Sequence, residues 1–295
     1  MIFYFAALAA ALSWAISSML AADPSKALGA IAFVRLRMTM VFVMLAAWIA
    51  LTGGWRSLET AHVAPTLISG FIGILVGDAA LFAAMNRLGP RRAGMLFASN
   101  AVFSVILGWL FLNECLSLPT LSGIVIALIG VVLAILYGKR ASQVHEWEAV
   151  KGPLWIGVAI GLFSGLCQAV GTLIARPVMT TGVDPATIAC IRVGVAALGL
   201  TLAMQFIPST KAKTSATPRM AAQIALSGLA AMGIGMTLLL YALSGGNVGV
   251  VTTLSATTPA IVLPMLWWRT GELPPVMAWV GAGLVIAGSG MIFVG

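Results

Sequence analysis

Ten apolar stretches, separated by short polar connections, account for nearly all of this 295-residue chain. A helix needs roughly 20 apolar residues to cross the hydrocarbon core of a bilayer, which is about 30 Å thick. Backbone groups in lipid must satisfy their own hydrogen bonds, so the stretches are predicted to be helices, because a membrane β-barrel would show short alternating strands. The predicted spans are 2–22, 28–52, 65–86, 93–112, 118–138, 153–175, 186–207, 220–243, 248–268 and 276–294. The sequence therefore predicts an all-α integral membrane protein with ten transmembrane helices.

The composition excludes a soluble globular protein. Hydrophobic residues make up 61% of the chain and charged residues 8%, whereas about 25% of the residues in a soluble domain are charged. The net charge of +8 does not indicate a nucleic-acid partner, because the basic residues lie in short connections between apolar spans. Cys115, Cys167 and Cys190 are isolated and lack C-x-x-C spacing, which favours buried thiols over metal or disulfide chemistry.

The two halves of the chain repeat one another. Glu114 and Glu272 lie 158 positions apart, and the same offset relates Gly77 to Gly235. Further pairs at this offset are Ser69-Gly70 with Ser227-Gly228, Gly123 with Gly281, and Gly130 with Gly288, while Arg35 and Arg192 lie 157 apart. The predicted units are a first five-helix repeat over 1–138, a connection over 139–152 and a second five-helix repeat over 153–295. Because five spans is an odd number, the second repeat must enter from the opposite face, which inverts it. Inverted repeats usually form a transport pathway where they meet.

The charge distribution predicts an orientation. Thirteen basic residues lie in or beside the connections after odd-numbered spans, and three lie on the other side. By the positive-inside rule, this difference puts both termini outside the cytoplasm. The first span lacks the basic leader of a secretory signal, so it is predicted to be a retained helix. Tight turns containing proline are expected at Ala22-Asp23-Pro24 and around Pro185.

Asp78 is the first candidate for a functional residue. It lies about mid-depth in the third span, and the equivalent position of the second repeat is Met236. A carboxylate in the membrane is costly unless it is solvated or paired. Asp78 is therefore interpreted either as a group that takes a proton or a substrate ammonium, or as a packing residue paired with a buried arginine or hydroxyl.

Arg35 and Arg192 are the cationic candidates. Each lies some seven residues inside the second helix of its repeat, so inversion is expected to place them near opposite faces of the membrane. A guanidinium there matches a substrate carboxylate at one mouth of the pathway. The alternative is an arginine whose head group simply reaches the membrane interface.

Uncharged hydrogen-bonding residues mark a possible wet cavity. Asn100, Gln168, Thr257 and Thr258 suit a site for a small polar solute, although interhelical hydrogen bonds explain each of them equally well. Pro259 is expected to bend or open the ninth helix beside the two threonines, because it lacks a backbone donor.

Aromatic and recurring residues complete the candidates. Trp14 and Tyr241, with Phe82, are expected either to line the cavity or to pack between helices. Glu114 and Glu272 end the fourth helix of each repeat and are predicted to bind free backbone donors at the start of the next helix. Gly77 and Gly235 are predicted packing residues.

Motifs of catalysis are absent from the sequence. It contains no nucleophile elbow, Walker loop, H-E-x-x-H or paired metal-ligand pattern, and Gly233-x-Gly235 lies inside an apolar span without the rest of a dinucleotide motif. We therefore expect no enzyme, no cofactor and no metal site. An enzyme acting on lipid would need a cluster of ionisable residues at one interface, and the acids here are spread apart.

The sequence resembles the drug/metabolite transporter superfamily, specifically tandem EamA-type domains, over essentially its whole length. The residues that carry the resemblance are Ser13-Trp14, Arg35, Arg192, Gly77-Asp78, Leu88-Gly89-Pro90-Arg91-Arg92-Ala93, Asn113-Glu114 and Gly271-Glu272. The chain departs from the family pattern at Asn100-Ala101, where a proline is common, and at Ser164-Gly165, which lacks a tryptophan partner for Trp14. The resemblance implies ten helices, cytoplasmic termini and export of amino acids or related metabolites from the bacterial inner membrane. The charge distribution contradicts that orientation, so the orientation stays open.

The functional hypothesis is a secondary transporter that works by alternating access and exports amino acids or related small polar metabolites. Its expected partners are a small-molecule substrate, the lipid bilayer and a proton or exchange solute, with no nucleic acid; the oligomeric state is open. The alternative is an importer of a vitamin, nucleotide derivative or other metabolite. A multidrug efflux pump and a non-transporting scaffold are further alternatives.

Overall fold

The computed structural model describes residues 1–88, 90–137, 152–206, 217–271 and 273–294. These residues form helices joined by turns, and none of them lies in a strand. Ten helical spans within them are long and apolar enough to cross a membrane, which confirms the predicted fold class. The third span is longer than predicted, because it runs from Thr60 to Leu88.

The helices of the first repeat are α1 (Ile2–Leu28), α2 (Ala30–Thr52), η1 (Gly54–Ser57), α3 (Thr60–Gly70), η2 (Phe71–Val76), α4 (Gly77–Leu88), α5 (Pro90–Ala98), α6 (Asn100–Leu112) and α7 (Leu118–Tyr137). Those of the second are α8 (Leu154–Met179), α9 (Pro185–Phe206), α10 (Pro218–Gly228), η6 (Leu229–Gly235), α11 (Met236–Gly245), α12 (Val248–Ser255), α13 (Thr258–Thr270) and α14 (Val276–Val294).

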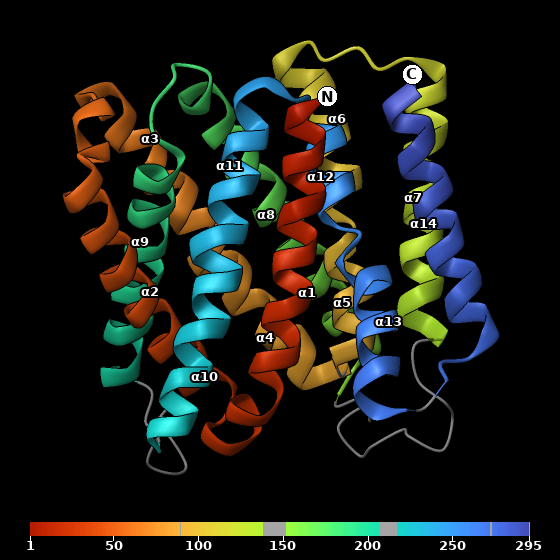
Figure 1. The fold of residues 1–295 in the computed structure, drawn as a ribbon, viewed down its shortest axis with the longest axis horizontal. Coiled ribbons are helices and arrows are strands. Elements are labelled where there is room, and N and C mark those ends of the chain that lie inside the picture. Colours follow the sequence, from red (N-terminus) through yellow and green to blue (C-terminus); the bar gives the residue numbers. More distant parts are fainter. Residues whose placement is uncertain (89, 138–151, 207–216, 272, 295) are drawn as a thin grey trace.

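Both termini lie at the same end of the bundle (Figure 1), which we call the terminal face. The turns 53–59, 113–117, 180–184 and 246–247 lie at this end too. The odd-numbered spans end at the opposite end of the bundle, here called the basic face, because most of the basic residues of the sequence follow these spans.

The two repeats contact each other reciprocally. The first helix of each repeat packs on the third helix of the other, so that α1 lies on α10, η6 and α11 while α8 lies on α3, η2 and α4. Equivalent helices also pair directly: α2 with α9, α6 with α12, and α7 with α14. Reciprocal contacts of this kind are typical of an isologous, two-fold arrangement. They are the structural form of the inverted repeat.

The α7–α14 pair at the edge of the bundle shows this symmetry at the level of single residues (Figure 1). A Cβ added at Gly130 would lie 2.5 Å from the Gly281 carbonyl oxygen, and one added at Gly281 would lie 2.7 Å from that of Gly130. Gly123 and Gly288 approach each other in the same way. Only residues without a Cβ let two backbones come this close.

Helix irregularities recur at the same offset as the sequence repeat. The π-helical segments η2 and η6 begin at Phe71 and Leu229, which are 158 residues apart. The fourth helix is interrupted in both repeats, at Ser99 and at 256–257. It ends in both on a residue with a left-handed backbone, Asn113 or Gly271. The two repeats therefore share their helix irregularities as well as their helices.

The predicted turn at Ala22-Asp23-Pro24 is wrong. Helix α1 continues to Leu28 with Pro24 inside it, whereas Pro185 begins α9 as expected. A proline removes one helical hydrogen bond, and the packing of α1 against the second repeat outweighs that loss.

The α7–α14 crossing generates a prediction. Gly130→Ala is expected to lower the Tm in detergent by several degrees, since overpacking costs about 1–3 kcal/mol and the contacted atoms belong to the backbone. Gly283→Ala, on the same helix pair but with no atom within 4 Å of the new methyl group, is the matched control and is expected to leave the Tm unchanged or raise it. Equal effects of the two variants in a thermal unfolding assay would contradict the close crossing.

Candidate functional site

The centre of the candidate site is Asp78, the second residue of α4, directly after the π-helical segment η2. Its side chain is half-buried, and the charges that act on it electrostatically belong to Arg37 of α2 and Arg192 of α9. The three residues come from the second and third helices of the first repeat and from the second helix of the second repeat. The start of α4 therefore lies where the repeats meet, with Asp78 within electrostatic reach of arginines from both of them.

Arg192 is completely buried, with 0% of its side chain exposed. Two glycines make room for it: a Cβ added at Gly70 would lie 2.8 Å from the Arg192 Cα, and one added at Gly73 would lie 3.3 Å from its Nη2. None of its three side-chain nitrogens has a hydrogen-bond partner among the described residues. A buried guanidinium without acceptors is costly, and buried polar groups are nearly always satisfied. Arg192 is therefore a buried cation whose hydrogen-bond donors are unused among the described residues.

The sequence analysis placed Arg192 at a mouth of the pathway. In the structure Arg192 lies about two turns inside α9, and its side chain is enclosed where α3 and η2 cross α9 at Gly70 and Gly73. Arg35, the repeat partner, is half-buried, with its Nε lacking an acceptor among the described residues. Arg37, which the sequence did not single out, is the residue of α2 that acts on Asp78. Arg37 has no matching arginine in the second repeat that would have marked it in the sequence. Its electrostatic action on Asp78 depends on which face of α2 turns inward.

The same backbone position has different chemistry in the second repeat. Met236, the counterpart of Asp78, is 2% exposed and belongs to the main apolar cluster. The indole Nε1 of Trp14 donates a hydrogen bond of 2.8 Å to the carbonyl oxygen of Ala231 in η6. A Cβ added at Gly235 would lie 2.7 Å from this Nε1, so the ring packs tightly between the helices. The Trp14 side chain is therefore packed and hydrogen-bonded between α1 and η6.

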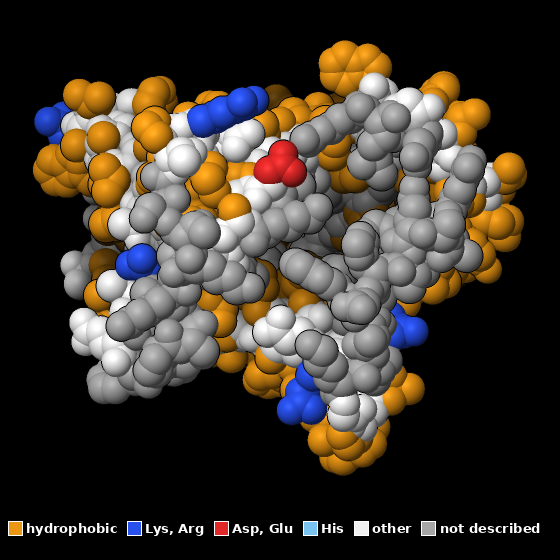
Figure 2. All heavy atoms as spheres, turned by 90° about the horizontal axis from the view of Figure 1, so that it is seen from below, with side chains coloured by type: hydrophobic (Ala, Val, Ile, Leu, Met, Phe, Trp, Pro, Cys, Tyr) orange, Lys and Arg blue, Asp and Glu red, His pale blue; other side chains and the backbone are white. Residues whose placement is uncertain are grey.

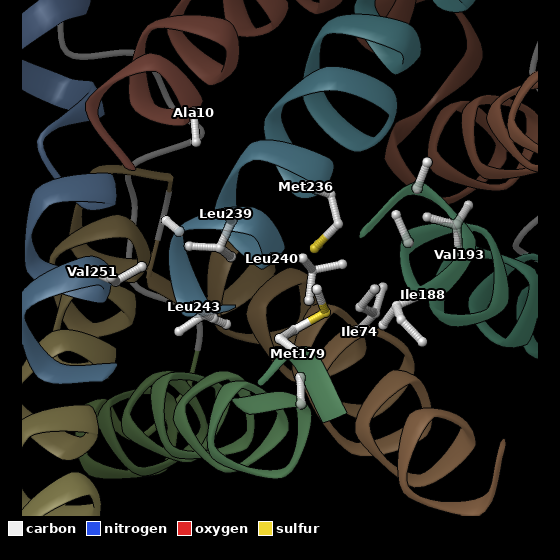
Figure 3. Close-up of a cluster of buried hydrophobic side chains, with 14 of the residues drawn as sticks. Ala10, Ile74, Met179, Ile188, Val193, Met236, Leu239, Leu240, Leu243 and Val251 are labelled. Atoms are coloured by element: carbon white, nitrogen blue, oxygen red, sulfur yellow. The ribbon is translucent and has the colours of Figure 1, made fainter. Parts of the chain in front are cut away.

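On the terminal-face side of the cluster, the interface between the repeats is filled by apolar side chains (Figure 3). None of the following is more than 2% exposed: Ile74, Met179, Ile188, Val193, Met236, Leu239, Leu240 and Leu243. Met179 ends α8 and Ile188 lies in the first turn of α9, so this plug extends to the terminal face. On the basic face, the Lys and Arg side chains that can be seen lie toward the margin of the bundle (Figure 2). The interface between the repeats is thus closed by apolar side chains toward the terminal face.

The remaining polar candidates are used mainly within the helices. Asn100, 7% exposed, donates from Nδ2 to the Phe97 carbonyl oxygen at 2.7 Å. Thr257 donates to the Leu254 carbonyl oxygen at 2.7 Å, and Thr258 contacts the Ala11 carbonyl oxygen of α1 at 3.2 Å. These side chains satisfy carbonyl groups at the two interruptions of the fourth helices.

Two further candidates lie close to the interruptions or the centre. Pro259 stands in the first turn of α13, after the interruption, and so begins a helix. Gln168 of α8 is half-buried, with its backbone nitrogen 3.8 Å from where a Cβ at Gly77 would lie, so it lies across from the start of α4. The Gly77 carbonyl oxygen accepts a hydrogen bond of 2.7 Å from Ser164.

Tyr241 does not line the interior. It is 37% exposed and its ring lies 5.5 Å from that of Phe3 on the outside of α1 and α11. An aromatic residue at this position contributes to the lipid-facing surface, and hydropathy alone does not distinguish the two faces of a helix in a membrane.

Glu114 binds a helix start, as predicted, but not the start of the next helix. Its two carboxylate oxygens accept the backbone N–H of Val248, the first residue of α12, at 2.8 and 2.9 Å. Because the repeats are interlocked, the nearest free donors belong to the fourth helix of the other repeat. Glu272 lies outside the described residues.

The model of the EamA-like transporter family matches residues 1–136 and 155–294. The chain belongs to this family. The resemblance to tandem EamA-type transporters is thereby confirmed, and this EamA-like transporter is a multi-pass membrane protein. A solved structure described only as a crystal structure of a protein shares its fold, with a TM-score of 0.82 at 17% identity over 99% of this chain and 96% of that chain. No curated protein matches the sequence of this chain.

The charge cluster of this EamA-like transporter generates a second prediction. Asp78→Asn and Arg37→Gln should each lower the Tm in detergent, and the double variant should lose less than the sum, because interacting residues show coupling of about 0.5–3 kcal/mol. Asp78→Asn combined with Arg35→Gln is the matched control, for which the losses should add. Additive losses in both pairs would refute the Asp78–Arg37 interaction.

Proposed function

We propose that this chain is a secondary transporter that exports amino acids or related small polar metabolites across the bacterial inner membrane by alternating access. One observation carries the proposal: a carboxylate, Asp78, lies within electrostatic reach of two guanidiniums, Arg37 and Arg192, that come from both repeats. Arg192 in addition has no hydrogen-bond acceptor among the described residues.

The charges of the cluster support a substrate that carries a carboxylate and an ammonium group. A guanidinium binds a carboxylate through two parallel N–H donors, which makes Arg192 the expected partner of the substrate carboxylate. Asp78 is the expected partner of the ammonium group. Buried charges are tolerated only when they are matched, so a ligand with both groups is favoured over a hydrocarbon or a simple cation. A multidrug efflux pump for cations is disfavoured for the same reason.

Alternating access is supported by the closure of the repeat interface toward the terminal face, where apolar side chains fill it. Inverted repeats that exchange conformations produce the opposite arrangement, with the site then reached from the terminal face. The closely packed glycine crossings allow one set of helices to rock against the other as rigid bodies.

The second candidate is an importer of a vitamin, a nucleotide derivative or another anionic metabolite. The cluster carries two positive charges and one negative charge, and this surplus of positive charge also favours an anion. Flux measured separately in each direction distinguishes the two candidates.

Counterflow in proteoliposomes tests the substrate class. We expect saturable exchange of at least one labelled amino acid, and Arg192→Gln should lower it about tenfold or more, because a hydrogen bond to a charged group is worth about 1.5–3 kcal/mol. Arg56→Gln, an exposed arginine at the terminal face, is the matched control and should retain exchange. Absence of saturable flux for every amino acid, nucleoside and vitamin tried would remove the substrate assignment.

Asp78→Asn tests coupling to protons. If Asp78 carries the coupling proton, the variant should lose transport driven by a pH gradient while retaining exchange of substrate for substrate. The measurement is uptake with and without an imposed gradient in the same vesicle preparation. Full gradient-driven transport by Asp78→Asn would show that another group couples transport to protons.

A further inference from the structure

A pocket of about 330 Å³ lies at the terminal face, away from the Asp78 cluster. It is lined by Leu112 and Glu114 after α6, by Arg176, Pro177 and Thr180 at the end of α8, and by Asn247 before α12. Its volume is at the lower end of the range of about 300–1,000 Å³ for ligand sites, which suits a small metabolite. The apolar plug that ends at Met179 separates this pocket from the centre of the bundle.

The acidic wall of the pocket is Glu114. Its carboxylate is fixed by the Val248 N–H, which both oxygens accept at 2.8 and 2.9 Å. A carboxylate offers about four acceptor positions, so one N–H leaves it able to accept further hydrogen bonds. The side chain is half-buried and lines the pocket.

The basic wall is Arg176. Its Nη1 donates to the Ser244 carbonyl oxygen at 3.4 Å, and its buried Nε has no acceptor among the described residues. No ion pair joins Arg176 to Glu114 in the described part of the chain, although both line the same pocket. Two opposite charges therefore line one pocket without forming an ion pair among the described residues.

We propose that this pocket binds a small zwitterion of the α-amino acid type, with its carboxylate on Arg176 and its ammonium group on Glu114. A ligand with one charge would leave the opposite wall unmatched, whereas a zwitterion pairs with both. Thr180 and Asn247 add polar groups at the rim. This second site goes beyond the proposed transport function, and it is filled from the terminal face while the plug is closed.

Thiol protection tests the site without requiring transport. Thr180→Cys in a Cys115→Ser background places one accessible thiol at the rim, since Cys167 and Cys190 are buried. A membrane-impermeant methanethiosulfonate reagent is applied from the terminal face with L-valine, L-valinamide or 2-hydroxyisovalerate. We expect valine to slow modification about tenfold, while the amide and the hydroxy acid, which each lack one charge, slow it little.

Matched variants test the charge assignment. Thr52→Cys, an exposed position at the same face, should be modified at the same rate with and without valine. In Arg176→Gln the carboxylate of valine loses its partner, so valine and valinamide should protect equally. In Glu114→Gln the ammonium group loses its partner, so valine and 2-hydroxyisovalerate should protect equally. In Arg192→Gln, protection by valine should persist.

Four results would overturn the site: no protection by valine, equal protection by all three compounds, equal protection of Thr52→Cys, or loss of protection in Arg192→Gln. If Glu114→Gln does not fold, the Arg176→Gln result decides. Protection without counterflow of any amino acid would contradict the proposed transport function and leave this site intact. Counterflow of an amino acid without protection would contradict this site and leave the proposed transport function intact.

Discussion

The hydrophobic effect does not drive helices together within a bilayer, because lipid tails are as apolar as the side chains. Close packing of the helix backbones must therefore hold them together. In this chain one set of close crossings joins the third helix of one repeat to the first helix of the other. A Cβ added at Gly171 of α8 would lie 2.6 Å from the Cα of Gly73, and the Ser69 hydroxyl donates to the Gly171 carbonyl oxygen at 2.6 Å. Trp14 makes the corresponding contact of α1 with η6. These crossings bring η2 and α4 to the centre and thereby place Asp78 beside arginines of both repeats.

The duplicated backbone carries chemistry that is not duplicated. Both third helices contain a π-helical segment, a feature that often marks functional sites. After the first lies Asp78, and after the second lies Met236 within the apolar plug. One half of the repeat interface is therefore charged and the other is dry. This difference leaves the interface packed with apolar side chains toward the terminal face.

Sequence reasoning succeeded where hydropathy and spacing carry the information, and failed where the rotation of a helix decides. Ten spans and an inverted duplication followed from apolar length and from pairs such as Gly130 and Gly288. Arg37 was overlooked, and Tyr241 was left open between lining the cavity and packing between helices, because in a membrane both faces of a helix are apolar and the inward face leaves no pattern. Pro24 was taken for a turn, although packing keeps it within α1. Arg176 likewise gained significance only from the pocket that it lines.

The sequence by itself determined that this chain spans a membrane ten times and that its halves are inverted copies, because the length of an apolar segment and an odd number of spans are local properties. Only the tertiary structure decided that Arg192 is enclosed and without a partner among the described residues, that Glu114 holds the start of α12, and that the interface is plugged at one end. These features depend on contacts between residues more than a hundred positions apart. Such contacts are fixed by how the glycine-lined crossings set the rotation and depth of each helix.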